Sequence, residues 1–170
     1  MWGLNSVTSA RLNLTPDQEE RVAKLKTPKD CEQFAINVEA RGKPELARAA
    51  RRRAIELRAL EHNAHSDPER EALQAVYAYE RVLSENAGKK IKATRTWQMI
   101  KRYGLILAVE HVVSRRKEAK GYTALVKMGM EDMAFEAVVV RHPEVFSGEA
   151  VERSRARLRE LTNLLDETAC

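Results

Sequence analysis

The stretch KTPKDCEQFAINVEARGKPELARAARRRAIEL (residues 26–57) carries the start and stop signals of two successive helices. Thr27 is a residue type that caps helix N-termini, and Pro28 fits the first helical position. Gly42 stands where a left-handed residue would end that helix, and Pro44 restarts another. The stretch therefore predicts a helical hairpin. Its helices are expected over residues 28–41 and from 43 to about 61.

The same signals recur on both sides of this hairpin. Thr15, with Pro16 after it and Gln18 three residues on, has the pattern of a capping box. Ser66, with Glu69 three residues on, marks another helix start. Further helices are expected over about 15–25, 66–85, 94–103 and 105–115, and from Ser147 into the C-terminal region.

Residues 115–143 carry sequence signals for more than one type of secondary structure. RRKEAKGY (residues 115–122) is a polar linker and a candidate hinge. The following residues predict two short helices that are broken near Gly129 and stopped at Pro143. The β-branched residues within 134–140 also fit a short strand. Helix and strand therefore both stay open for that segment.

The composition agrees with a folded helical chain. The 170 residues are 44% hydrophobic and 32% charged, which favours a packed core over disorder. We therefore predict an all-α, globular bundle of about seven to eight helices with an N-terminal helical hairpin. A single helical domain is expected over residues 1–170. Its expected sub-lobes are helical hairpins over 15–86 and a C-terminal helical lobe over 94–170.

The charge and the cysteines narrow the partners and the compartment. Thirty Lys and Arg against 25 Asp and Glu leave a net charge of +5, which suits nucleic acid, an anionic membrane surface or an acidic protein. No apolar run is long enough for a signal peptide or a membrane span, so neither is expected. Cys31 and Cys170 form no CxxC motif, so a reducing compartment is favoured. The predicted location is cytoplasmic.

A basic segment is the best candidate for a binding site. NAGKKIKATRTWQMIKRYGLILAVEHVV (residues 86–113) holds six Lys and Arg, and no acid stands between Glu85 and Glu110. Cations concentrated in this way are typical of surfaces that contact phosphates of DNA or RNA. The alternative is that they only solvate the outer side of a helical core. The predicted nucleic-acid-binding residues are Lys89, Lys90, Lys92, Arg95, Gln98, Lys101 and Arg102.

Helical periodicity places the last four of these residues on one side of a helix. At 100° per residue, these four residues, Arg95, Gln98, Lys101 and Arg102, fall within an arc of about 120°. The opposite side carries Trp97, Met99, Ile100 and Tyr103. We expect Trp97 and Tyr103 to be core anchors and not platforms for base stacking.

Gly104 lies between two expected short helices, as the turn glycine of a helix-turn-helix does. Such a motif needs an apolar anchor about six residues later, but that position is Glu110. The second helix would also present a poor set of base-reading groups. We therefore favour phosphate contacts over sequence reading. The outer residues expected on that helix are Leu107, Glu110, His111, Ser114 and Arg115.

The hairpin at residues 31–57 resembles the two-helix unit of tetratricopeptide repeats, in which small residues let paired helices approach closely. Arg51 stands where that pattern has a tyrosine, and no second copy follows roughly 34 residues later. The resemblance therefore implies a closely packed helical pair and no array of repeats. The residues with matching spacing are Gly42, Ala47, Ala54, Ile55 and Leu57.

The last expected helix supports an alternative function. Val151, Leu158 and Leu165 recur every seven residues, and Leu161 fills the gap between them. Such a stripe can close a core or bind a partner helix. The alternative prediction is therefore a protein-interaction or assembly scaffold. Val151, Leu158, Leu161 and Leu165 are its candidate interface, for a homo-oligomer or another protein.

Signals for catalysis are sparse. His62 and His65 lie beside acids at the end of a helix, but further metal ligands are missing. EAK at residues 118–120 resembles the end of a nuclease motif, but no expected strand carries it. Cys31, near a helix start, is either a thiol of lowered pKa or a buried small side chain. A non-catalytic role without metal or cofactor is favoured, and a small hydrolase or nuclease is the third alternative.

Overall fold

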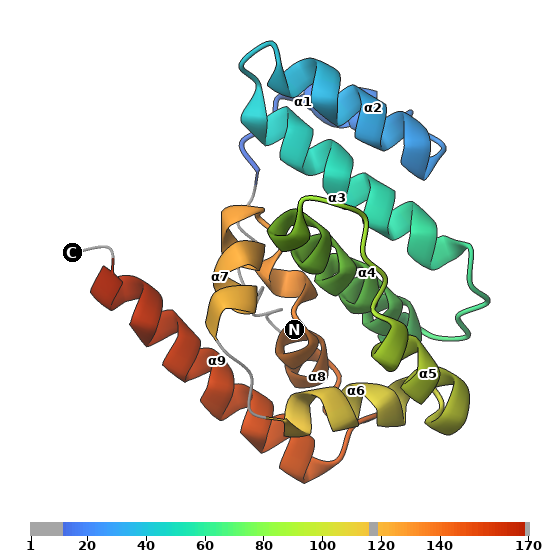
Figure 1. The fold of residues 1–170 in the computed structure, drawn as a ribbon, viewed down its shortest axis with the longest axis vertical. Coiled ribbons are helices and arrows are strands. Elements are labelled where there is room, and N and C mark those ends of the chain that lie inside the picture. Colours follow the sequence, from blue (N-terminus) through green and yellow to red (C-terminus); the bar gives the residue numbers. More distant parts are fainter. Residues whose placement is uncertain (1–11, 116–118, 169–170) are drawn as a thin grey trace, which may run out of the picture.

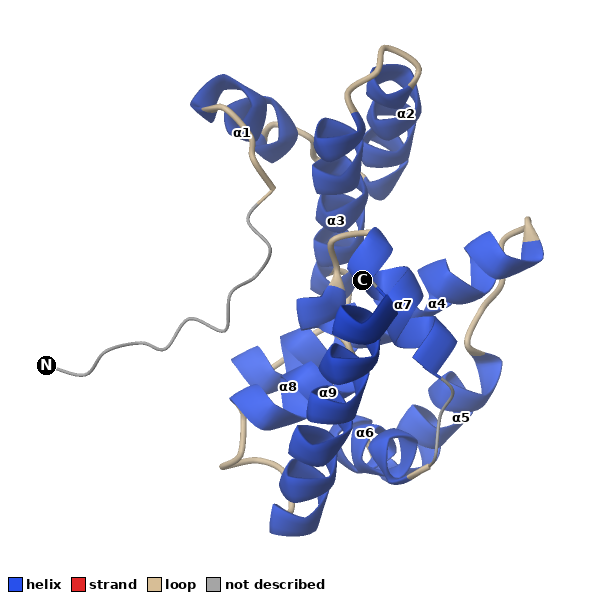
Figure 2. Cartoon of the chain, turned by 90° about the vertical axis from the view of Figure 1, so that its left-hand side faces the viewer, coloured by secondary structure: helices blue, strands red, loops and turns tan. Residues whose placement is uncertain are grey.

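The computed structural model describes residues 12–115 and 119–168, and these ranges contain helices and loops but no strand (Figure 2). The all-α prediction is confirmed. The nine α-helices in the described ranges slightly exceed the seven to eight expected. They are α1 (Pro16–Ala23), α2 (Pro28–Glu39), α3 (Pro44–Leu60), α4 (Asp67–Ala87), α5 (Thr94–Tyr103), α6 (Leu105–Ser114), α7 (Ala119–Lys127), α8 (Phe135–Arg141) and α9 (Gly148–Thr168), with a 3-10 turn η1 (Glu131–Met133) before α8.

The residues expected to cap helix N-termini do so in the structure. The Thr15 hydroxyl accepts from the backbone N–H of Gln18 at 3.3 Å, and the Gln18 side chain accepts from the Thr15 N–H at 2.9 Å. Thr27 and Ser66 each accept from the backbone N–H three residues later. These bonds satisfy donors that the start of a helix leaves without intrahelical partners. At the other end of α4, Gly88 adopts a φ of 64°, which ends the helix in the left-handed conformation.

The predicted N-terminal hairpin consists of α2 and α3, with α1 beside them at the top of the molecule (Figure 1). Fully buried Ala35, Ala47 and Ala50 lie between these helices, and their small side chains allow close approach. Leu46 and Val22 complete this part of the core. The pairing therefore depends on small side chains, as the spacing in the sequence indicates.

The larger part of the core surrounds α4. Val76 of α4 packs with Val109 of α6, Val138 of α8 and Val151 of α9. On another side of α4, Ala78 and Val82 share a cluster with Ile55 of α3, which extends the hairpin into this core. Because α4 contacts helices from both halves of the chain, it joins the hairpin to the C-terminal helices.

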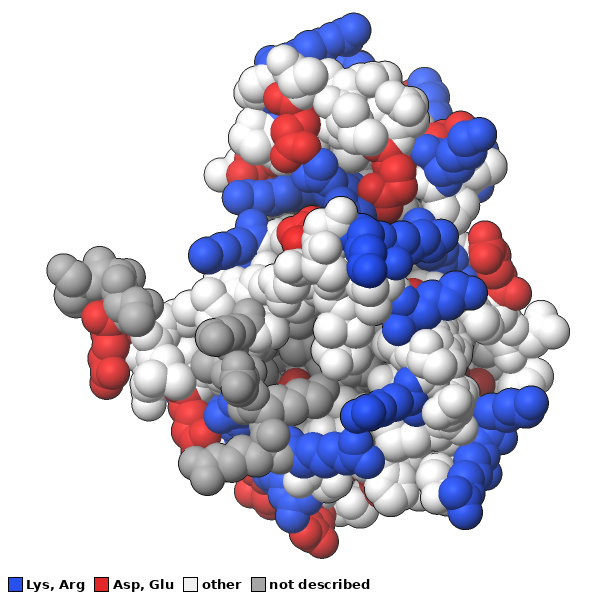
Figure 3. All heavy atoms as spheres, viewed as in Figure 1, with Lys and Arg blue, Asp and Glu red and all other residues white. Residues whose placement is uncertain are grey.

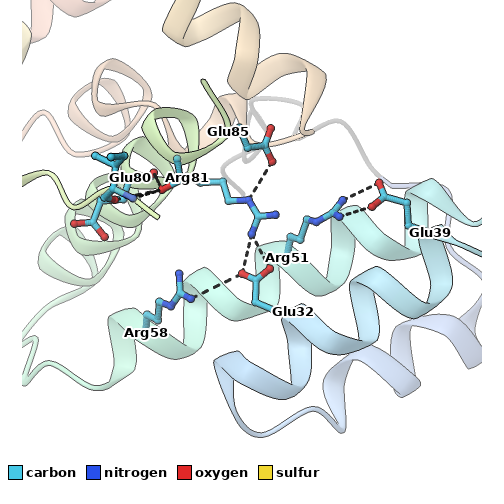
Figure 4. Close-up of polar contacts among 9 residues, drawn as sticks. Glu32, Glu39, Arg51, Arg58, Glu80, Arg81 and Glu85 are labelled. Carbon is cyan, nitrogen blue, oxygen red and sulfur yellow. Dashed lines mark hydrogen bonds and ion pairs between the residues drawn. The ribbon is translucent and has the colours of Figure 1, made fainter. Parts of the chain in front are cut away.

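Ion pairs also join the hairpin to the rest of the fold. Arg81 of α4 donates to both carboxylate oxygens of Glu32 in α2, at 2.7 and 2.8 Å (Figure 4). Arg52 of α3 donates to the Asp132 carboxylate of η1 at 2.7 Å. A bidentate pair that is partly removed from water constrains the orientation of both partners. These contacts hold α2 and α3 against α4 and η1.

The structure settles the helix-or-strand alternative for residues 134–140 and corrects the length of the linker predicted at 115–122. Residues 135–141 form α8, so the strand alternative for 134–140 is wrong. Val138 and Val139 are buried there, and their packing overrides the low helical propensity of β-branched residues. The linker predicted at 115–122 is shorter than expected, since α7 begins at Ala119. Residues 116–118 lie outside the described ranges.

Membrane insertion was not expected from the sequence. Within the described ranges, every helix is too short or too polar to cross a bilayer.

Candidate nucleic-acid interface

The seven residues predicted to bind nucleic acid are all exposed. Arg95, Gln98, Lys101 and Arg102 lie on the outer side of α5. On its inner side, Trp97, Met99 and Ile100 are partly buried and pack against the larger part of the core, around α4. Helix α5 is therefore amphipathic, as its periodicity indicates. The remaining three residues, Lys89, Lys90 and Lys92, precede the helix.

Glu80 of α4 fixes the start of α5. Its Oε1 atom accepts from the backbone N–H of Ala93 at 2.9 Å and from the Trp97 indole N–H at 2.7 Å. The Trp97 ring stacks on the His62 ring, with a centroid distance of 5.4 Å and an interplanar angle of 16°. These contacts confirm Trp97 as an anchor. They also hold the opposite, basic side of α5 toward solvent.

His62 and Tyr77 complete this anchor. The His62 Nε2 atom lies 2.7 Å from the Tyr77 hydroxyl oxygen. Burial raises the pKa of the Tyr77 hydroxyl, and the nearby Glu80 carboxylate raises it further. Tyr77 therefore stays neutral, and its hydroxyl group can hydrogen-bond to the imidazole nitrogen. The rings of His62, in the loop before α4, and of Tyr77, on α4, both contact the Trp97 ring.

An open hollow of about 320 Å³ lies between α5 and α6. Arg95, Gln98 and Arg102 line it from α5, and His111 and Arg115 complete the polar lining from the α6 side. None of the described residues that line it is an Asp or Glu. Three guanidinium groups therefore surround one hollow without a neutralising carboxylate. We call this feature the arginine hollow; Met99 and Tyr103 are its remaining lining residues.

Four cations on or next to the arginine hollow have no acidic partner among the described residues. In the described part of the chain, no ion pair within 4.0 Å involves Arg95, Lys101, Arg102 or Arg115. Figure 3 shows Lys and Arg atoms grouped at the lower right, over α5, whereas basic and acidic atoms alternate over α2 and α3. Positive potential is therefore concentrated near the arginine hollow.

The lysines before α5 have different surroundings. Lys90 lines a second hollow together with Glu32, Glu80 and Glu85, and with Arg58 and Arg81, so charges of both signs line that hollow. The backbone next to it is held in place, because the Ile91 N–H donates to the Ser84 hydroxyl at 2.9 Å. The structure therefore separates Lys90 from the residues of the arginine hollow.

The expectation that Tyr103 is a core anchor is wrong. Its side chain is 41% exposed at the end of α5, where it lines the arginine hollow. The Tyr103 ring centroid lies 5.2 Å from the guanidinium carbon of Arg102 and 5.2 Å from the His111 ring centroid. The apolar side of α5 is thus wider than the part of the helix that packs on the core, and Tyr103 lies beyond that part.

Sequence reasoning missed Tyr103, His111 and Arg115 as parts of one site. The helical periodicity of residues 105–115 does place His111 and Arg115 on the outer side. It does not reveal the direction of α6 relative to α5. Gly104, with a φ of 82°, sets that direction and brings both side chains to the arginine hollow.

Glu110 takes a structural role at the position where a helix-turn-helix would have an apolar anchor. Its carboxylate accepts a hydrogen bond from the backbone N–H of Ser147, just before α9. A carboxylate at a helix N-terminus is favoured by the helix dipole. Glu110 therefore links α6 to the start of α9. Together with Glu149 of α9 it lines another hollow.

The candidate residues for a partner helix have mixed surroundings. Val151 and Leu161 are buried within this chain, at 4% and 3% exposure, so they close its core. Leu158 and Leu165 are partly buried. Leu164, between them, is 46% exposed. The C-terminal half of α9 thus keeps some apolar surface, and a partner there stays a prediction.

The residues considered for catalysis do not form a site within the described ranges. His62 is engaged with Trp97 and Tyr77, and no group of three potential metal ligands is found there. The last two residues of the EAK motif, 119 and 120, belong to helix α7, and Glu118 lies outside the described ranges. Cys31 is fully buried, and burial raises the pKa of its thiol. Cys31 therefore has the surroundings of a structural side chain.

The burial of Cys31 leads to a testable prediction. In a C170S variant, the Cys31 thiol should react with a disulfide reagent at least on the order of 100-fold more slowly than in denaturant, because reaction requires local opening. The reaction is followed by absorbance at constant pH. Equal rates in the native and denatured protein would contradict the buried position.

No family model matches the chain, and comparisons with curated proteins and with solved structures give no match either. The geometry of the residues is therefore the basis for inferring a function.

Proposed function

We propose that this protein binds nucleic acid, without catalysis, through the outer side of α5 and the adjoining end of α6. One observation carries the proposal. Arg95, Arg102 and Arg115 line one open hollow, no described acid lines it, and none of the three has an ion pair in the described part of the chain. Lys101, exposed on the same helix, extends the basic surface.

The chemistry of guanidinium groups favours phosphate as the ligand. Arginine presents several N–H donors in a planar fork that fits the oxygens of a phosphate. Neutralising successive phosphates of a nucleic acid also releases condensed counterions, which favours binding. Elsewhere in the fold, Arg51, Arg52 and Arg81 already donate to carboxylates of the same chain. The arginines of the hollow, which have no such carboxylate partner in the described part of the chain, are available to an external anion.

The contacts expected here would position nucleic acid more than select its sequence. Phosphate contacts carry little sequence information, because every nucleotide has the same phosphate. Gln98 is the one amide side chain among the described residues of the lining, and amides read base edges well only when two bonds can form. We therefore expect similar affinities for unrelated sequences.

Paired substitutions test this proposal. R95Q/R102Q should weaken binding of fluorescein-labelled oligonucleotides about equally for unrelated sequences. It should also reduce the slope of log affinity against log salt by about 1.4 to 1.8 units, because two phosphate contacts are lost. Fluorescence anisotropy at several salt concentrations measures both quantities.

R41Q/K43Q is a matched control. Arg41 and Lys43 are exposed, and they lie between α2 and α3, far from α5 in both ribbon views (Figures 1 and 2). The control removes the same charge and should change the slope little. Equal losses in the two double variants would mean that net charge alone determines binding, which would reject the α5–α6 surface.

The exposed Leu164 supports a second candidate function, a protein-interaction or assembly role for α9. If α9 builds an oligomer, L158S/L165S should dissociate it, or unfold the chain where these partly buried side chains also support the core. Sedimentation velocity, combined with circular dichroism, separates these results. A folded monomer both before and after the substitutions would remove α9 as an assembly site.

A further inference from the structure

We infer that the arginine hollow holds one unstacked nucleotide of a single strand, with the backbone phosphates next to that nucleotide on the arginines and its base against Tyr103. This inference rests on the proposed function and specifies its ligand. It uses an observation that phosphate binding does not need, namely an aromatic ring that is 41% exposed in the same hollow as three guanidinium groups.

The lining combines two chemical characters. Met99 and Tyr103 supply apolar and aromatic surface, and Arg95, Arg102 and Arg115 supply positive charge. A nucleotide has the same division, since its base offers a flat π surface and its phosphate a negative charge. Proteins that bind single strands commonly stack bases on aromatic rings while basic side chains follow the backbone. The hollow therefore matches both parts of one ligand.

Tyr103 belongs to a small group of flat side chains. The guanidinium group of Arg102 lies over its ring at 5.2 Å, and the His111 ring is tilted by 38° at a centroid distance of 5.2 Å. Guanidinium, imidazole and phenol groups can each stack on a base. A base that enters the hollow can therefore exchange the Arg102–Tyr103 contact for stacking on the same groups.

The size of the hollow favours a single strand over a duplex. About 320 Å³ lies near the lower end of the volumes of small-ligand sites, which start at about 300 Å³. That volume suits roughly one nucleotide. In a duplex the bases are stacked and paired, so only phosphates reach a surface of this kind unless a base is extruded. Tyr103 is thus accessible to a base of a single strand.

The substitution Y103L tests the stacking contact. It should weaken binding of a single-stranded oligonucleotide about fivefold or more, whereas binding of a duplex of the same length should change less than about twofold. The salt slope should not change, because no phosphate contact is lost. Y103F, which keeps the ring, should bind as the unmodified protein does. Single-stranded DNA and RNA are both titrated, by fluorescence anisotropy.

L107A is the control for lost apolar surface. Leu107 is 52% exposed on α6 and lies outside the lining of the arginine hollow. Its replacement should leave the affinities for single strand and duplex unchanged. Equal weakening by L107A and Y103L would overturn the assignment of a base to Tyr103.

Y103W gives a measurement that does not depend on removing the ring. It should bind single strands at least as tightly as the unmodified protein, and stacking should quench its added indole fluorescence. Quenching no greater than in the unmodified protein, which has two tryptophans, would overturn the inference. If Y103L leaves strong, salt-dependent binding of single strand and duplex unchanged and Y103W shows no added quenching, the inference fails and the proposed function stands. If no nucleic acid binds at low salt, the proposed function fails as well.

Discussion

Replacing Glu80 by leucine should lower the free energy of unfolding by about 2–4 kcal/mol, because two donors lose their shared acceptor. The Glu80 carboxylate accepts from the Ala93 backbone N–H and from the Trp97 indole N–H, and both groups are largely removed from water. The loss is measured by urea unfolding, followed by far-ultraviolet circular dichroism. Because Glu80 holds the start of α5, E80L should also weaken binding at the arginine hollow.

E80Q separates the lost acceptor from the lost charge. The glutamine side chain keeps a carbonyl oxygen that both donors can reach, so stability should fall by less than about 1.5 kcal/mol. Similar, small losses in E80L and E80Q would show that these hydrogen bonds do not hold α5 on α4.

A second large loss is expected from D132L. Asp132 is the bidentate partner of Arg52, whose side chain is 24% exposed, and the carboxylate raises the pKa of that guanidinium group. Without Asp132, a partly buried charge keeps a weaker pair with Glu56, at 3.6 Å, and a long hydrogen bond to the Gly129 carbonyl, at 3.5 Å. Solvent screens part of the loss, so we expect a decrease in stability of about 2–3 kcal/mol, measured by urea unfolding.

The double variant R52M/D132L tests the physical reason for that loss. Removing both charges leaves no guanidinium without a partner, so the double variant should be more stable than D132L alone. A double variant that loses the sum of the two single effects would show that Arg52 and Asp132 act independently. The contact would then not couple α3 to η1.

Local signals in the sequence predicted most of the helices. The Thr15 and Ser66 caps and the turn at Gly42 act within a few residues, so they can be recognised without knowledge of the fold. The residues 134–140 could not be assigned in this way. Their helix is stabilised by packing against α4, α6 and α9, and these contacts involve residues far away in the sequence.

The candidate site could be predicted only in part. The amphipathic pattern of residues 94–103 correctly placed Arg95, Gln98 and Arg102 on an exposed side. The same pattern assigned Tyr103 to the core, because periodicity describes one helix and does not reveal where its neighbours end. The approach of Arg115 to α5 likewise depends on how the chain turns at Gly104.

The most direct test of nucleic-acid binding is an anisotropy titration of the unmodified protein with single-stranded DNA, RNA and duplex DNA at low and moderate salt. If Arg95, Arg102 and Arg115 each neutralise a phosphate, log affinity for single strands should fall with log salt with a slope of about 2. Single strands should bind more tightly than the duplex. Absence of binding to all three at low salt would contradict the proposed function.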